Sequence, residues 1–355
     1  MRISVPKRRL LRAAQSLIVL LCGQALSGCY YLQAAHGQYQ LVAKREPVSA
    51  VVAAADTDAE RRQKLAVSQS ALAFAHDTLL LPDNGSYRQF VDLKRDHVVV
   101  NVFAAEPFSV SAKTWCYPFV GCLAYRGYFK QASAERYAQK LRDKGLDVIT
   151  AKVPAYSTLG RFKDPVLNTM LTRTDAGLAN LLFHELAHQV LYVPDDTAFN
   201  ESFASFVAAE GVRRWRDAGA DVIAPEPDAN VRRRRDHARA LLDGLRDGLR
   251  ALYAAPVSEM DMRAAKARVF EQFAVRWREA GFRSPAPANN AALLPRSLYA
   301  DRTQAFAAVL KKCKDELPCF YASVHVLAEM DKPQRDANLD ALIAEMDALN
   351  QSLVR

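Results

Sequence analysis

The sequence predicts an α+β fold, with a small sheet in the first half of the chain and a mostly helical second half. The 355 residues, half of them hydrophobic, are enough for one large domain or two closely joined smaller ones. Segments 97–104 and 147–153 are rich in β-branched residues, which predicts strands. After Gly160 the apolar spacing is helical almost to the C-terminus, with breaks near 219–228 and 284–295.

Before Gly160, the remaining elements are read from stop signals and apolar spacing. A helix is expected from about Asp56 to Leu80, because the proline and glycine of segment 81–85 then end it. Segment 115–129 is rich in tyrosine and cysteine and is expected to be a loop region. A second helix is expected over 133–144, ending at Gly145. The first half is therefore expected to contain helix, strand, loop, helix and strand in that order.

The N-terminus has the pattern of a bacterial export signal. Five basic residues and no acidic residue precede an apolar run from about Ala13 to Leu26, which is too short for a comfortable membrane span. The sequence Leu26-Ser27-Gly28-Cys29 then resembles a lipobox, in which the cysteine becomes an acylated N-terminus. An ordinary signal peptide with a chance cysteine is the alternative. Tyr30 after the cysteine favours the outer membrane, on its periplasmic face, by the enterobacterial sorting rule.

The formal net charge of +9 belongs to the whole chain and falls when the export signal is removed. Loss of the five basic residues of the signal reduces it to +4, and nothing in the composition calls for nucleic acid as a partner. The run Arg232–Arg235 is the one tempting basic patch. It opens a helical pattern with interleaved charges, so we expect a solvated helix face there.

The six cysteines divide between the N-terminus and the exported domain. Cys22 falls in the signal and Cys29 in the lipobox, and the other four are Cys116, Cys122, Cys313 and Cys319. An oxidising compartment predicts two disulfides. Both pairs share a C-x5-C spacing with a proline inside, so local pairing is preferred among the three possible connectivities. Zinc binding by these four cysteines is the alternative, although structural zinc sites usually have closer spacings.

The strongest chemical signal is His184-Glu185-Leu186-Ala187-His188, in a helix-compatible segment from about Thr174 to Tyr192. Residues four apart lie on one face of a helix, so both imidazoles can bind one ion. Glu185 can reach a water on that ion without being a ligand, as a general base must. The alternative is a surface helix with a chance spacing, and a third ligand is the test that separates the two.

A third ligand is expected on the following helix. One zinc peptidase pattern needs a metal ligand at position 194 and a glycine at position 191. This chain has Pro194 and Leu191 there, so that pattern is rejected. The chain instead breaks at Pro194, offers Asp196 or Thr197 as a helix cap, and continues as a helix to about Arg216.

A short connection makes the two helices antiparallel neighbours, which brings Glu201 near His188. Small residues at 204, 205 and 208 let the backbones approach closely. Glu210, the competing carboxylate, lies about half a turn round the helix from Glu201.

These residues resemble the gluzincin metallopeptidases, in which an asparagine-glutamate pair on the next helix supplies the third zinc ligand. The match is the HExxH motif at 184–188 followed by Asn200-Glu201-x-x-Ala204, at an interval of twelve residues. The chain also resembles a bacterial family of zinc aminopeptidases, many of them lipoproteins. That resemblance rests on the blocks Trp115-Cys116 to Cys122, Tyr125 to Phe129, Pro154 to Gly160, Asp164-Pro165 and Asn200 to Ala204.

The resemblance implies a zincin-like metallopeptidase with an edge strand for an extended substrate. Its segments would be the cleaved signal 1–28, a lipidated start and tether at 29–55, and the peptidase domain at 56–355. The implied metal is Zn²⁺, held by His184, His188 and Glu201, with Glu185 as general base.

The implied partners are a peptide or protein substrate and a membrane bound through the lipid. Candidate oxyanion donors, on residue type alone, are Tyr156, Tyr321 and His325. Glu106 is a possible ligand for a substrate amine, and Arg126 a possible ligand for a carboxylate. An endopeptidase, or a non-catalytic envelope lipoprotein active in protein assembly or quality control, is the alternative function.

Overall fold

The computed structural model describes residues 30–117, 121–220, 229–295 and 302–353. The signal segment and Cys29 lie outside these residues, so the lipobox stays a prediction. The chain divides into two compact units, residues 1–45 and 46–355. In the first unit residues 30–43 are helical, within the segment 29–55 that was predicted to be a tether. None of the helices in the described part of the chain is long and apolar enough to cross a bilayer.

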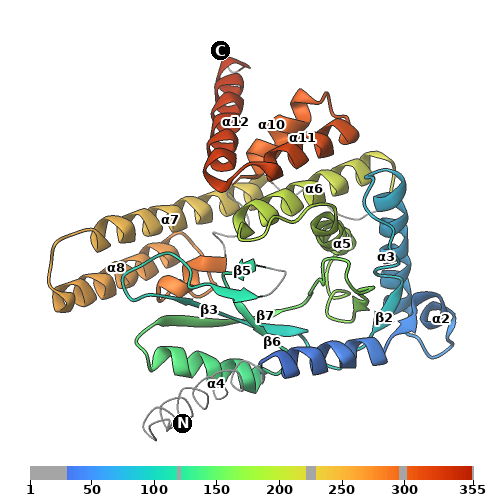
Figure 1. Ribbon diagram of the computed structural model, residues 1–355, viewed down its shortest axis with the longest axis horizontal. Helices are drawn as coiled ribbons and strands as arrows, with labels where there is room; N and C mark the ends of the chain where they lie inside the picture. The colour runs from blue at the N-terminus through green and yellow to red at the C-terminus, as the bar shows by residue number, and fades with distance from the viewer. Residues whose placement is uncertain (1–29, 118–120, 221–228, 296–301, 354–355) are drawn as a thin grey trace, which may run out of the picture. The chain divides into compact units, whose positions relative to one another are not determined.

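The second unit is α+β, as predicted (Figure 1). Its strands are β1 (Glu46–Pro47), β2 (Gln89–Val91), β3 (Val99–Ala105), β4 (Trp115–Tyr117), β5 (Gly121–Leu123), β6 (Arg126–Tyr128), β7 (Asp147–Val153) and β8 (Val166–Leu167). Its helices are α2 (Val48–Ala53), α3 (Ala59–Asp77), α4 (Gln131–Arg142), α5 (Asp175–Val190), α6 (Thr197–Asp217), α7 (Ala229–Tyr253), α8 (Glu259–Glu279), η1 (Asn290–Leu293, a 3-10 helix), α10 (Thr303–Lys312), α11 (Leu317–Glu329) and α12 (Lys332–Leu353). The described strands therefore all precede α5, and the described chain beyond α5 is helical.

The largest pairing is the antiparallel sheet β6-β3-β7. β7 pairs along its whole length with β3, so that Val99 lies opposite Val153. β3 is buried at every residue, which requires cover on both faces. Phe103 and Ala105 pack against Ala291 of η1 and the following Leu294. Helix α4 also lies along the sheet (Figure 1). β7 lies at one edge of this sheet, because its pairing in the described chain is to β3 alone.

The prediction that segment 115–129 is a loop region is wrong. The segment contains β4, β5 and β6, and β4 and β5 form a hairpin in which Cys116 lies opposite Cys122. These two cysteines are joined by a disulfide. Each strand has only three residues, which is too short for an alternating apolar pattern to be visible in the sequence. A second small sheet has the order β1-β2-β8.

Helices α5 and α6 begin at the caps that the sequence suggested. The Thr174 side chain accepts a hydrogen bond from the Gly177 backbone N–H at 3.1 Å, and Asp196 caps α6 in the same way. The two helices pack closely against each other and cross at an angle, with α5 seen nearly end-on beside α6 in Figure 1. A Cβ at Gly211 would lie 2.8 Å from the Phe183 ring, so only glycine allows this approach of the two helices.

The opposite side of α6 packs on α10 and α11 through aromatic rings. Ring centroids of neighbouring pairs are 5.4–6.3 Å apart, within the range of favourable edge and stacked contacts. The rings belong to Phe199, Phe203, Phe206, Phe306 and Phe320. α6 is therefore fixed between α5 and the C-terminal helices.

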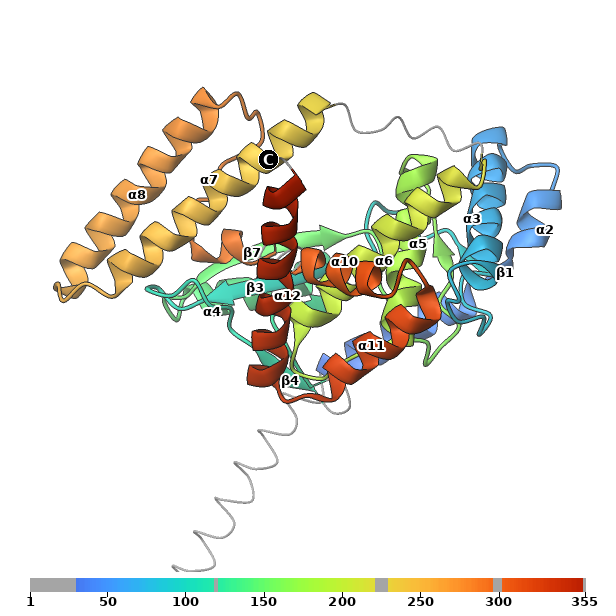
Figure 2. The same ribbon diagram turned by 90° about the horizontal axis from the view of Figure 1, so that it is seen from above.

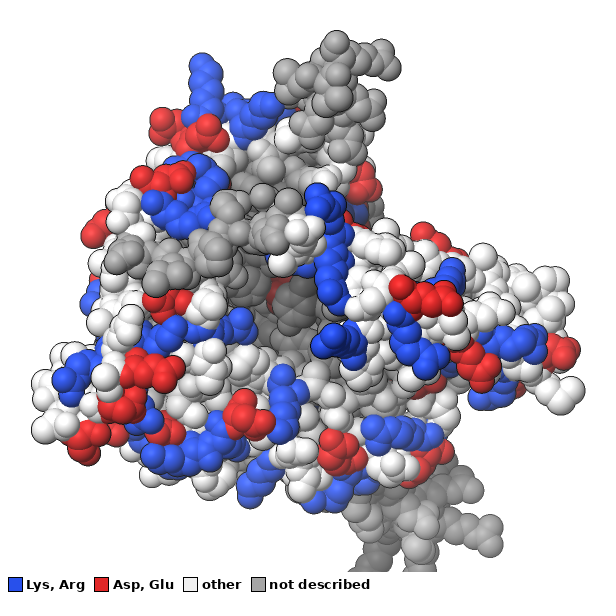
Figure 3. All heavy atoms as spheres, turned by 180° about the vertical axis from the view of Figure 1, so that it is seen from behind, with Lys and Arg blue, Asp and Glu red and all other residues white. Residues whose placement is uncertain are grey.

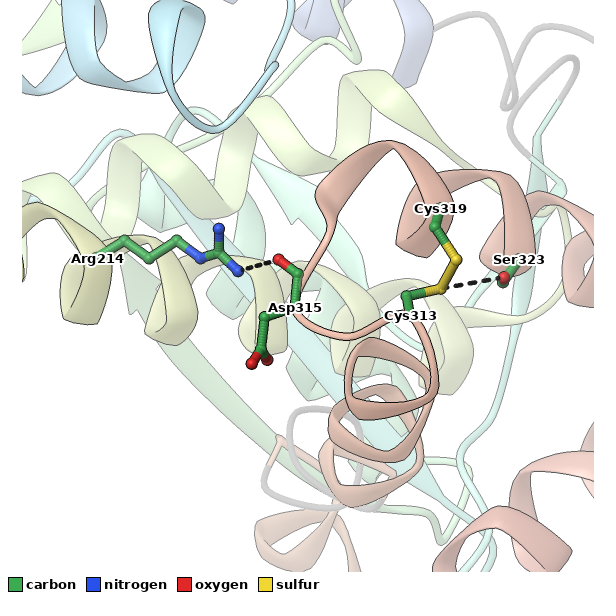
Figure 4. Close-up of a disulfide and its surroundings, with 5 residues drawn as sticks. All are labelled: Arg214, Cys313, Asp315, Cys319 and Ser323. Atoms are coloured by element: carbon green, nitrogen blue, oxygen red, sulfur yellow. Dashed lines mark hydrogen bonds between the residues drawn. A yellow bond between two sulfur atoms is a disulfide. The ribbon is translucent and has the colours of Figure 1, made fainter.

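The second disulfide, Cys313–Cys319, closes the turn between α10 and α11 (Figure 4). In that turn the Asp315 carbonyl oxygen accepts a hydrogen bond from Arg214 of α6 at 2.7 Å. Both local pairings predicted from the C-x5-C spacing are confirmed. The disulfide thus shapes the turn that contacts the C-terminal half of α6.

Helices α7 and α8 form a pair (Figure 2). Leu245 and Leu249 of α7 join Phe273 and Trp277 of α8 in one buried cluster. The basic run Arg232–Arg235 was predicted to lie on a solvated helix face. It lies in α7, and the side chains described there, 233–235, are exposed. On the face seen in Figure 3, acidic and basic side chains are interspersed, and basic ones border a central hollow.

Candidate metal centre

Three side chains from α5 and α6 converge on one point. The Nε2 atoms of His184 and His188, one helical turn apart on α5, are 3.1 Å from each other. Glu201, in the second turn of α6, places one carboxylate oxygen 3.3 Å from the first nitrogen and the other 3.7 Å from the second. Among the described residues these three form the one group of histidine, cysteine and carboxylate side chains close enough to hold an ion. We call them the metal group.

The spacing of the metal group fits a tetrahedral ion. Bonds of about 2.0–2.1 Å to zinc place two ligand atoms of a tetrahedron about 3.3 Å apart. The observed distances, 3.1, 3.3 and 3.7 Å, are close to that value, and those to Glu201 involve one carboxylate oxygen each. Glu201 Oε2 and His188 Nδ1 are also buried without a hydrogen bond. A carboxylate oxygen in that state fits a cation ligand better than a purely structural role.

Burial and neighbouring charges set different pKa values for the two imidazoles. Burial lowers the pKa of His188 to about 4, against a weaker opposing effect of Glu201. Burial also disfavours the charged form of His184, but the Glu201 carboxylate, 3.3 Å from its Nε2, and the charge of Glu185 outweigh it and raise the pKa of that ring. His188 is thus in the neutral form that binds a metal throughout the physiological range.

Glu185 follows the first histidine and is half-buried. Burial raises the pKa of its carboxyl to about 7, helped by the nearby charges of Glu201 and Asp164 and opposed by His184. A carboxyl with that pKa can accept and return a proton near neutral pH. The predicted general base therefore lies beside the metal group.

Asn200 places Glu201 at the site. Its side-chain oxygen accepts from the Val193 backbone N–H at 2.8 Å, and its amide nitrogen donates to the Val193 carbonyl at 2.7 Å. Asn200 is 2% exposed. These bonds tie the first turn of α6 to the connection from α5, which explains why an asparagine precedes the glutamate. The sequence drew attention to the Asn-Glu pair but not to this role.

The disulfide hairpin braces the same connection. The Cys122 backbone N–H donates to the Asp195 carboxylate at 2.6 Å. A Cβ at Gly121 would lie 2.8 Å from that carboxylate, and Gly121 has a φ of +78°, so glycine is required here. Burial raises the pKa of Tyr192, and the charges of Glu201 and Asp195 add to the shift, which places its phenol in their neighbourhood. The sequence did not single out Tyr192.

Tyr87 is a second residue that the sequence did not single out. It is 1% exposed, and burial raises the pKa of its phenol, with Glu185 and then Asp164 adding to the shift. The preceding segment contacts the end of α5, where the Asn84 amide donates to the Gln189 side-chain oxygen at 2.7 Å. The segment between a helix and a three-residue strand carries no pattern that would predict these contacts.

The structure does not bring all the predicted catalytic candidates to the metal group. The Tyr321 hydroxyl donates to the Leu79 carbonyl at 2.9 Å, and its ring packs against Phe203, so it serves in packing behind α6. His325 lies exposed on α11. The Tyr156 ring packs edge-on against Phe129, at 5.7 Å between centroids, and its catalytic role stays a prediction.

The other candidates named from the sequence have partners elsewhere. Glu106 is exposed at the end of β3, and its backbone carbonyl accepts from Asn290. The Arg126 guanidinium lies over the Tyr137 ring at 4.8 Å. Glu210 pairs with Arg213 and Arg214 at 2.6 and 2.7 Å, the structural role expected for the competing carboxylate of α6.

Comparison with known protein families places the chain in a family. A family model whose description reads "Putative aminopeptidase" matches residues 29–339, which is most of the chain. No curated protein and no solved structure matches.

Proposed function

This chain belongs to the family described as "Putative aminopeptidase", and from that premise we propose that it is a zinc-dependent aminopeptidase of the HExxH type. The observation that carries the proposal is the metal group, two imidazole nitrogens and one carboxylate at the spacing of a tetrahedral ion. Two imidazoles and one carboxylate also form the ligand set of several zinc peptidases. The order β3, α4, β7, α5 supports a zincin-like arrangement, with β7 available as an edge for an extended substrate.

The chemistry follows from the residues around the group. When bound, zinc supplies a Lewis acid that polarises the scissile carbonyl and lowers the pKa of a water toward neutrality. Glu185 would accept a proton from a water whose oxygen attacks the carbonyl carbon. Glu185 then gives the proton to the amine nitrogen as the carbon–nitrogen bond breaks. One water is consumed for each peptide bond, and the carboxyl returns to its starting state.

Glu185→Gln tests this proposal in the zinc-loaded protein. We expect zinc content to stay at the parent value and kcat on peptides to fall about 10²- to 10⁴-fold, the usual contribution of a general base. Glu210→Gln is the matched control, because this carboxylate pairs with arginines on the same helix as Glu201. Equal activity of Glu185→Gln and the parent would refute the catalytic proposal.

A peptide-end profile tests the aminopeptidase class. The panel pairs each peptide with its N-acetylated form. We expect release of single residues from the free N-terminus and little cleavage of acetylated peptides. Equal cleavage of both forms at internal bonds would make the protein an endopeptidase with the same metal chemistry.

We further propose that the mature chain starts at an acylated Cys29 and lies on the periplasmic face of a bacterial outer membrane. Support comes from the sequence alone: the basic start and apolar run, the lipobox Leu26-Ser27-Gly28-Cys29, and Tyr30 for the outer membrane. Cys29→Ser should move the protein from the membrane fraction to the soluble fraction of the envelope. An unchanged distribution, or a mature N-terminus at another residue by mass spectrometry, would contradict the anchor.

A further inference from the structure

The helix at residues 30–43, which we call the N-terminal helix, presents an apolar face to solvent. At about 100° of rotation per residue, an arc of about 120° contains only aliphatic and aromatic side chains. All six of them are exposed, and we call them the apolar face: Tyr31, Leu32, Ala35, Tyr39, Val42 and Ala43. A helix of a globular protein normally turns such an arc toward the core. This helix therefore has the pattern of one that contacts an apolar surface outside the protein.

The apolar face is a local concentration and not the general state of the surface. Eleven large hydrophobic side chains are exposed in the described chain, and four of them lie among the fourteen residues of this helix. Leu32 is 70% exposed and Tyr39 is 68% exposed. A continuous exposed face of this kind marks a site of interaction, whereas single exposed apolar residues do not.

The residues around the apolar face fit an anionic lipid surface. Residues 1–45 contain no acidic residue, and all 39 acidic residues of the chain lie from Glu46 onward. Lys44 and Arg45 directly follow the helix, and Lys44 is exposed. Basic residues beside a bilayer are attracted to its anionic headgroups. Two of the large side chains on the face are tyrosines, a residue that is enriched where a membrane meets water.

The position of the helix in the chain points to the same partner. It begins at residue 30, directly after Cys29 of the lipobox. An acyl chain on Cys29 would hold the first turn of the helix at the level of the headgroups. The apolar face would then start within one residue of the lipid.

We propose that the N-terminal helix lies in the membrane–water interface, with the apolar face among the headgroups and upper acyl chains of an anionic bilayer. The inference rests on the proposed lipid anchor, which it extends from one acylated residue to a helix of fourteen residues. A single weak membrane signal binds reversibly, and stable attachment takes two signals. Loss of the acyl group should therefore still release the protein from membranes during cell fractionation.

Vesicle binding of the mature chain without its acyl group tests the helix apart from the anchor. The protein is residues 29–355 with Cys29→Ser, and the probes are vesicles of phosphatidylcholine with and without phosphatidylglycerol. We expect binding to the anionic vesicles that weakens with added salt, and weaker binding to the neutral ones. In Leu32→Ser/Tyr39→Ser the binding constant should fall at least about 10-fold, because two exposed apolar side chains no longer enter the lipid.

Val257→Ser/Met260→Ser is the matched control, because it removes two exposed apolar side chains outside this helix. It should bind vesicles as the parent does. Absence of binding by the parent, parent-like binding by Leu32→Ser/Tyr39→Ser, or an equal loss in the control would overturn the proposal. Self-association of the parent without vesicle binding, abolished by Leu32→Ser/Tyr39→Ser in sedimentation, would overturn it too, because a second copy would then cover the face.

A pair of tryptophan variants reads the orientation of the helix in the vesicle-bound protein. Tyr39 lies on the apolar face, and Gln40 is exposed about 100° further round the helix. The native tryptophans do not interfere, because all three are buried: Trp115, Trp215 and Trp277. We expect brominated phospholipids to quench the added fluorescence of Tyr39→Trp and not that of Gln40→Trp. Equal quenching of the two would contradict the orientation.

Failure of the anchor and failure of the helix contact give different results. If Cys29→Ser leaves the distribution in cells unchanged, the proposed anchor fails, and the vesicle experiments still decide on the helix. If the anchor holds and the mature chain with Cys29→Ser ignores anionic vesicles, the helix contact fails by itself.

Discussion

Two buried acids near the start of α6, Asp196 and Glu201, lie in opposite environments. Asp196 is 2% exposed in its side chain and has cationic partners from α12, with Arg335 bonding through two nitrogens at 2.8 and 3.0 Å and Lys332 at 3.2 Å. It also caps α6. Glu201, little more than a turn later, has one buried oxygen without a hydrogen bond and two imidazoles beside it.

The difference separates a structural acid from a ligand acid. A buried carboxylate that only stabilises a fold is paired and hydrogen-bonded, because an unpaired buried charge is strongly unfavourable. Asp196 meets that requirement from the protein alone. Glu201 has only the two imidazoles beside it, and the cation that we propose for the site would complete its pairing. On this view α6 is fixed at its N-terminus by Asp196 so that Glu201 can keep its lone pairs for a metal.

Removal of the metal should give the largest effect and separates the two acids most clearly. Chelation is expected to reduce turnover to background while the helices persist, because Asp196 and the aromatic contacts of α6 do not depend on zinc. At zinc concentrations 100 to 1,000 times the dissociation constant, the free energy of unfolding should be about 3–4 kcal/mol higher than in the metal-free protein. Circular dichroism and urea unfolding check this, and a metal-free chain without helical signal would contradict it.

Arg335→Met should remove the buried ion pair of Asp196 and leave the surroundings of Glu201 unchanged. Removing one partner of a buried ion pair destabilises a protein by about 3–5 kcal/mol. We expect a loss of that size in urea unfolding, with the zinc content per folded chain unchanged. Arg302→Met, which removes a more exposed pairing with Asp336, is the control and should have a smaller effect. Equal losses in both variants would remove the distinction drawn for Asp196.

Asn200→Ala should moderately lower both the free energy of unfolding and the zinc affinity, because Asn200 lies between the two acids in the sequence. Loss of its two bonds to Val193 leaves backbone groups unpaired, which lowers the free energy of unfolding by about 1–3 kcal/mol. The altered connection should weaken zinc binding about 10-fold, as for other residues that orient a metal ligand. Competition with a chromogenic chelator measures the affinity. Unchanged zinc affinity would mean that Glu201 is placed without this residue.

Asp96 offers a third case, an exposed acid, and the smallest effect. Hydrogen bonds from Lys152 and His97 lower the pKa of its carboxyl to about 2, from 3.8. Because the folded pKa is lowered, its contribution to stability is present above about pH 4 and is lost as the pH falls toward 2. Asp96→Asn should flatten this part of the stability profile and lower stability at pH 7 only slightly, because the pairs are exposed. A large effect at pH 7 would show that exposure does not weaken such pairs here.

The helices and caps of the site could be predicted because their causes are local. Spacing within α5, the break at Pro194 and the cap at Asp196 all act over a few residues, and β7 coincides with the strand predicted at 147–153. The C-x5-C spacing likewise indicated the disulfides.

The missed features depend on residues far apart in the chain. Asp196 was predicted as a cap, but nothing near it indicates Arg335. Tyr87 lies in a segment without a pattern, and its neighbourhood with Glu185 arises only when α3 packs on α5. Tyr321 was chosen by residue type, which cannot show that Leu79 already accepts its hydroxyl proton.

Zinc content of Glu201→Ala, compared with Glu210→Ala, tests the metal group most directly. Both variants remove one carboxylate from α6, but only Glu201 lies beside the two imidazoles. We expect one zinc per chain in the parent and in Glu210→Ala, and loss of zinc during dialysis from a folded Glu201→Ala protein. Full zinc content in Glu201→Ala, or equal loss in both variants, would contradict the assignment of Glu201 as a ligand.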